Sequence, residues 1–84
     1  MKQADLLQQV IEAMKELIED LTVPRNVRTK IEAAAAALQS NQELSIRIDK
    51  AMQQLDEMAN DPNTQPYTRA QIWNIVSMLE SVSS

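Results

Sequence analysis

The 84-residue sequence contains no cysteine, histidine or glycine, and each absence excludes a class of structure or site. Without cysteine there is no disulfide, and without cysteine or histidine there is no thiolate or imidazole ligand for a metal ion. Small proteins commonly rely on such cross-links. We therefore expect a fold that rests on apolar packing, with no metal or other cofactor. Without glycine, phosphate-binding loops and tight hairpin turns lose their usual residue.

Long apolar runs and an excess of positive charge are also missing. The longest apolar run is the alanine-rich stretch 33–38, which is far too short to span a membrane. The first residues include the charged Lys2 and Asp5 and lack the apolar segment of a signal peptide. We therefore expect a cytoplasmic protein and no membrane contact. The net charge of −4 disfavours bulk binding to nucleic acid.

Candidates for catalysis are few. General bases and nucleophiles at neutral pH are mostly histidine, cysteine, or a lysine or carboxylate perturbed in a pocket, and no serine has a visible activating partner. Asp61, Asn63 and Gln65 have the spacing that opens a calcium loop, but Pro66 and Ile72 occupy its glycine and glutamate positions. We assign this segment to turn formation and predict that the protein is not an enzyme.

Apolar residues recur at steps of three and four in four segments, which is the period of an amphipathic helix. The first predicted helix covers residues 3–21, and Pro24 separates it from a second helix that runs to Leu38. Ser40 and Glu43 have the spacing of a capping box, which predicts the start of a third helix that ends near Ala59. The turn-forming segment 60–66 precedes a fourth helix, over residues 66–82.

The two halves of the sequence resemble each other. In each half a proline is followed by an arginine and an isoleucine: Pro24, Arg28 and Ile31, then Pro66, Arg69 and Ile72. Two helical hairpins about 42 residues apart can close on each other as a bundle or stack as solenoid repeats, but two hairpins are too few for a stable solenoid. We therefore predict one domain over residues 1–84, an all-α four-helix bundle made of two pseudo-repeated helical hairpins.

Basic residues cluster at the predicted helix starts, where a cation opposes the helix dipole by about 0.3 to 1 kcal/mol. One interpretation is structural: the arginines bridge the helix corners to nearby carboxylates, among them Asp20 and Asp61. The other is an accessory protein of nucleic-acid machinery that makes local phosphate contacts. The candidate anion contacts are Arg25, Arg28, Lys30 and Arg69.

The fourth predicted helix has an apolar arc of roughly 220°, wider than the stripe of just over 100° that a surface helix turns to its own core. Trp73 and Met78 lie on opposite rims of this arc, and Trp and Met are both enriched at interfaces. With the polar Tyr67 and Asn74 at the edge, these residues form a candidate protein interface. The pattern predicts a non-catalytic interaction module, either a homodimer or a module that docks on another protein.

Four segments resemble a known family: 23–28 (VPRNVR), 44–48 (LSIRI), 60–63 (NDPN) and 68–74 (TRAQIWN). It is the small archaeal family catalogued as uncharacterised protein family number one hundred and forty-seven. The resemblance covers nearly the whole chain, and its most specific parts are the two junctions where proline precedes arginine. It implies a compact four-helix bundle of archaeal cytoplasmic origin, and it implies no activity and no site residues.

Overall fold

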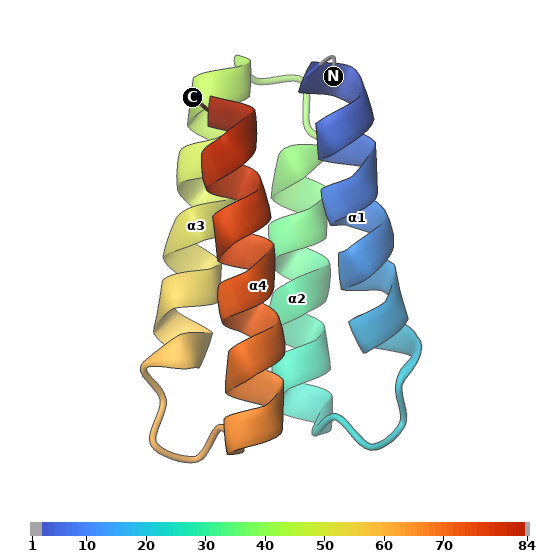
Figure 1. The fold of residues 1–84 in the computed structure, drawn as a ribbon, viewed down its shortest axis with the longest axis vertical. Helices are drawn as coiled ribbons and strands as arrows, with labels where there is room; N and C mark the ends of the chain where they lie inside the picture. Colours follow the sequence, from blue (N-terminus) through green and yellow to red (C-terminus); the bar gives the residue numbers. More distant parts are fainter. Residues whose placement is uncertain (1–2, 84) are drawn as a thin grey trace.

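The computed structural model describes residues 3–83, which form four α-helices joined by short turns. The helices are α1 (Gln3–Glu19), α2 (Arg25–Leu38), α3 (Leu44–Ala59) and α4 (Pro66–Ser83). They run alternately up and down in a bundle of 33 × 21 × 20 Å, with the start of α1 and the end of α4 at the same end (Figure 1). None of the described helices is long and apolar enough to cross a membrane.

The helices are arranged as a closed ring in which each touches two neighbours. The neighbouring pairs are α1 with α2, α2 with α3, α3 with α4, and α4 with α1, and within the described residues the backbones of diagonal helices do not come close to each other. The contact between α2 and α3 is the most extensive. Alanines explain this closeness, because Ala34 and Ala35 are buried on α2 and add no bulk.

The apolar stripes predicted from the sequence face the centre of this ring. Met14, Ile31, Leu55 and Ile72, one from each helix, have no exposed surface. Burial of apolar area at about 25 cal/mol per Å² is the main stabilising term for such a core. Ile46, on the same helix as Leu55, lies outside the stripe and is 38% exposed. The predicted all-α four-helix bundle is confirmed.

The internal repeat is more regular than the prolines indicated. The Asp20 and Asp61 carboxylates each accept a backbone N–H from two residues later, at 2.9 Å in both cases. The N–H groups of Val23 and Thr64 then donate to the carbonyls of these aspartates at 3.1 and 3.0 Å. Equivalent residues are therefore 41 positions apart throughout, as are Arg28 and Arg69. The pairing of Pro24 with Pro66 was wrong, because Pro24 corresponds to Gln65.

Two helix boundaries also differ from expectation, each because of a side-chain hydrogen bond. The helix α1 ends at Glu19, because the Asp20 carboxylate accepts bonds from the Thr22 backbone N–H at 2.9 Å and hydroxyl at 2.6 Å. Leu21 is consequently 85% exposed and not part of the apolar stripe.

The capping box predicted for Ser40 and Glu43 was also wrong. The Ser40 hydroxyl donates to the Ala37 carbonyl at 2.9 Å, so this side chain belongs to the end of α2. Glu43 is the N-cap residue of α3 and makes no side-chain capping hydrogen bond.

Candidate functional site

The four residues of the predicted interface lie on two different edges of α4. Asn74 lines a hollow shared with α1, and Tyr67 and Met78 follow the same edge at helical spacing. Trp73 lies about 100° further round the helix than Asn74 and one turn after Arg69, which reaches α3. The structure therefore brings Tyr67, Asn74 and Met78 together and places Trp73 apart from them, on the α3 edge.

Exposure differs strongly among these residues. Tyr67 is 71% exposed and Trp73 is 44% exposed, whereas Met78 is half-buried and packs against the core. The Tyr67 hydroxyl accepts a hydrogen bond from Gln71 Nε2 at 3.3 Å. The largest uncovered apolar group on the α3 edge of α4 is thus the indole of Trp73.

Arg69 spans the corner between α3 and α4, but its partners are backbone carbonyls and not the expected carboxylate. Its Nε donates to the Ala59 carbonyl at 2.9 Å, and its Nη2 donates to the carbonyls of Asp61 and Thr64 at 3.1 and 3.0 Å. The last carbonyls of a helix have no partner within the helix. Arg69 supplies one for the end of α3 and fixes the turn that follows it.

Arg47 has a related role that the sequence analysis missed. Its Nη1 donates to the Leu38 carbonyl, at the end of α2, with a distance of 2.9 Å. Arg28, Arg47 and Arg69 are each the fourth residue of their helix, and the backbone N–H of each donates to the residue that precedes the helix. This shared position at the helix start could have identified Arg47 from the sequence. Arg47 was overlooked because no proline marks the start of α3.

Arg28 lies at the corner between α1 and α2, near Asp20. The pKa of the Asp20 carboxyl is lowered, first by the hydrogen bond from the Thr22 hydroxyl, then by that from the Thr22 backbone N–H, and also by the positive charge of Arg28. Asp20 is therefore ionised at neutral pH.

The four candidate anion contacts do not form one cluster. Arg25 is exposed, and Lys30 and Arg28 are half-buried on opposite flanks of α2. The Arg69 guanidinium lies apart from them, because it donates to carbonyls at the corner between α3 and α4. Arg69 therefore bridges a helix corner, as the structural interpretation expected, but through backbone carbonyls in place of the expected carboxylate.

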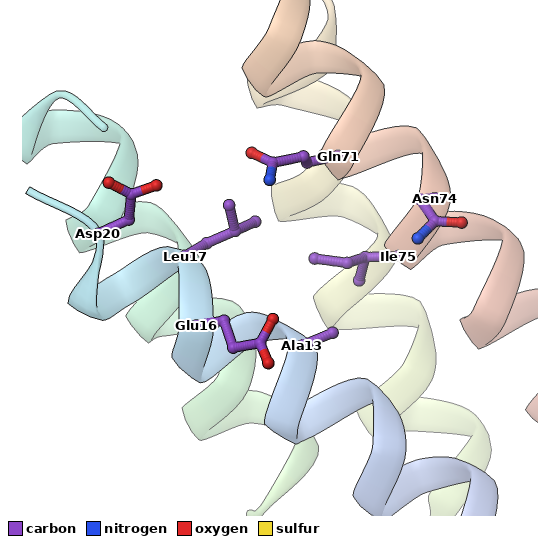
Figure 2. A pocket seen from close by; sticks show the side chains of 7 residues that line it. All are labelled: Ala13, Glu16, Leu17, Asp20, Gln71, Asn74 and Ile75. Carbon is purple, nitrogen blue, oxygen red and sulfur yellow. The ribbon is translucent and has the colours of Figure 1, made fainter. Parts of the chain in front are cut away.

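A hollow with a volume of about 210 Å³ lies between α1 and α4. Its apolar floor is formed by Ala13, Leu17 and Ile75, and its polar lining by Glu16, Asp20, Gln71 and Asn74 (Figure 2). Gln71 Oε1 is buried and accepts no hydrogen bond. Among residues 3–83, no lysine or arginine lines the hollow, and no group of three acidic side chains could hold a metal ion.

Fold and sequence together define a small all-α protein built from two equivalent helical hairpins. The chain belongs to the Uncharacterised protein family UPF0147, whose model matches residues 1–82. The family resemblance seen in the sequence is therefore confirmed.

Curated relatives match almost the full chain. A UPF0147 protein of Methanocaldococcus jannaschii is 46% identical over 79 residues, which are 93% of this chain and 85% of that protein. One of Thermoplasma acidophilum is 40% identical over 80 residues, covering 94% and 91%.

Two crystal structures share the fold. A protein of unknown function has a TM-score of 0.87 at 46% identity, covering 93% of this chain and 90% of that one. A UPF0147 protein from Thermoplasma acidophilum has a TM-score of 0.88 at 39% identity, covering 94% of both chains. The names of these relatives assign no biochemical role, so the function of the family is unknown.

Proposed function

We propose that this protein is a non-catalytic helical interaction module that self-associates through α4, in the cytoplasm, as the family resemblance implies. The observation that carries this proposal is the position of Trp73. It is the only tryptophan of the chain, and it remains 44% exposed on a helix that has two neighbours in the bundle.

The side of α4 that faces the core is already packed against the other helices. Ile72, Ile75 and Leu79 are buried against the rest of the bundle, so the Trp73 indole is surplus to the packing of one chain. Tryptophan is strongly enriched among the residues that dominate the binding energy of interfaces. A domain of this size buries a smaller fraction of its surface than a larger domain does, so further burial at about 25 cal/mol per Å² adds substantially to its stability.

A second copy of the chain is the partner that this surface favours. In a twofold dimer the same patch is used by both subunits, so an exposed indole on one α4 faces the equivalent patch of the other. The interface then needs no charged partner, in keeping with a chain whose surface is acidic overall.

Sedimentation equilibrium of the wild type and of Trp73→Glu tests the proposal. We expect the wild type to approach the mass of two 9.5 kDa chains with increasing concentration. Trp73→Glu should remain a single chain, because a buried unpaired carboxylate opposes association. Tyr67→Glu is the matched control on the other edge of α4 and should behave as the wild type. A wild-type mass of one chain at high micromolar concentration would contradict self-association.

A further inference from the structure

The hollow between α1 and α4 has a counterpart in the other half of the ring. Because the two hairpins are equivalent, the α1–α4 contact corresponds to the α3–α2 contact. Residues 41 positions apart therefore occupy corresponding places: Glu16 and Asp20 of the hollow correspond to Glu57 and Asp61. The degree of exposure also agrees, with both glutamates exposed and both aspartates half-buried.

The counterpart differs from the hollow in one decisive respect, which is a positive charge. The position equivalent to Gln71 is Lys30, and both residues are half-buried on the flank of their helix. The positions of Asn74 and Ile75 are taken by Ala33 and Ala34, whose small side chains let α2 and α3 approach closely. One copy of the repeat thus carries a lysine at this position, and the other carries the neutral Gln71 beside a hollow whose lining, within the described residues, contains no lysine or arginine.

We propose that the hollow between α1 and α4 binds a protonated alkylamine, whose ammonium group supplies the positive charge that Lys30 carries at the equivalent position in the other half of the ring. The volume of about 210 Å³ accommodates a short alkyl chain against Leu17 and Ile75. The polar lining supplies hydrogen-bond acceptors from both helices, as the side chains around the hollow in Figure 2 show.

The chemistry of the lining selects an ammonium over a metal ion or an anion. An ammonium has three donors and no acceptor, which suits carboxylate oxygens and amide oxygens. Gln71 Oε1 is a buried acceptor without a donor, and such groups in native proteins are normally satisfied. The ionised Asp20 and the exposed Glu16 provide the charge-assisted bonds. The same group is carried by a free alkylamine and by a lysine side chain of a partner protein.

The site does not depend on the proposed self-association, because Trp73 lies on the opposite edge of α4. Amine binding and self-association can therefore be tested, and contradicted, independently of each other. Binding is measured on the wild type and repeated on Trp73→Glu, which should bind the amine equally well.

Titration of the full chain with n-butylammonium chloride, followed by amide chemical shifts at constant ionic strength, tests the site. We expect saturable shifts centred on residues 13–20 and 71–75. Tetramethylammonium, which has the same charge and no N–H donor, should bind at least about tenfold more weakly. Glu16→Gln should weaken butylammonium binding about tenfold, whereas Glu12→Gln, on the same helix and outside the hollow, should not change it. A lysine-containing dipeptide amide that binds more tightly than butylammonium would identify a protein side chain as the source, and the reverse would identify a free amine.

A second variant supplies the cation from within the chain. Gln71→Lys should abolish butylammonium binding and melt at a higher temperature than Gln71→Met, which has a similar length and no charge. Equal affinity for the two cations, equal effects of Glu16→Gln and Glu12→Gln, or the same melting temperature for the two Gln71 variants would each overturn the proposal.

Discussion

Three arginines in the first turn of three successive helices break the usual preference for acidic residues at that place. Arg28, Arg47 and Arg69 each oppose the dipole of their own helix by about 0.3 to 1 kcal/mol. Arg47 and Arg69 offset this by donating to carbonyls at the end of the preceding helix. Hydrogen bonds that involve a charged group contribute about 1.5 to 3 kcal/mol, so the exchange is favourable. These two side chains thereby tie the corner between α2 and α3 and the corner between α3 and α4.

Replacement of Arg69 by methionine should lower the free energy of unfolding by about 2 kcal/mol, because three carbonyl oxygens lose their donor. Arg25→Met is the matched control, since Arg25 is exposed in the first turn of α2, and it should change stability by less than about 1 kcal/mol. Urea denaturation measures both. Equal losses for the two variants would show that the carbonyl contacts of Arg69 do not stabilise the corner.

Asp20 should make stability depend on acid pH. Its folded-state pKa lies below the ordinary value of 3.8, mainly because the Thr22 hydroxyl donates to the charged form. The contribution is therefore fully present above the pKa of the unfolded chain and is lost as the pH falls through the lower pKa of the folded state. The urea midpoint of the wild type should fall more steeply below about pH 4 than that of Asp20→Asn. Parallel pH profiles for the two proteins would contradict this account.

At the scale of elements, the loss of stability caused by a substitution on α3 depends on whether the residue lies inside or outside the apolar stripe. Leu55 has no exposed surface and Ile46, on the same helix, is 38% exposed. Leu55→Ala should cost about 2 to 5 kcal/mol, because it removes buried methyl groups and leaves a cavity. Ile46→Ala should cost less than about 1 kcal/mol. Thermal or urea unfolding compares them, and similar losses would mean that the two sides of α3 had been assigned wrongly.

The helices were predictable from the sequence because apolar residues recur regularly at the helical period over a long stretch of each one. Their ends were less so, because short-range side-chain bonds decide them. The Asp20 carboxylate ends α1 by binding Thr22, and Ser40 bonds backwards to Ala37, although its spacing to Glu43 is that of a capping box. Such bonds compete with helix capping, and the residue types alone do not say which will form.

The hollow could not be predicted, since it depends on the contact between the first and last helices. Glu16 looks like part of a solvated face when α1 is considered alone. Only the closure of the ring brings it to Gln71 and Asn74, more than fifty residues later. Of its polar lining, only Asn74 was a candidate site residue. The equivalence of Gln71 and Lys30 was also hidden, because the proline-based alignment of the two halves was one residue out of register.

At the scale of the whole molecule, a nearly twofold ring is built from one hairpin used twice, with one tight contact and one looser contact. Ala33 and Ala34 allow α2 and α3 to pack closely, whereas Asn74 and Ile75 occupy the same positions between α4 and α1. The ring satisfies its own apolar stripes and still leaves Trp73 half-exposed. We therefore expect the interactions of the protein to be made by α4.

The single tryptophan allows the most direct test of this account, because its fluorescence reports only on Trp73. Emission and acrylamide quenching are measured as the protein concentration is raised from about 1 µM to about 200 µM, the range in which association by mass action should appear. We expect the emission maximum to shift to shorter wavelength and the quenching to fall, as the indole passes from water into the interface between two α4 helices. Emission and quenching that stay those of a solvent-exposed indole over the whole range would contradict self-association through α4.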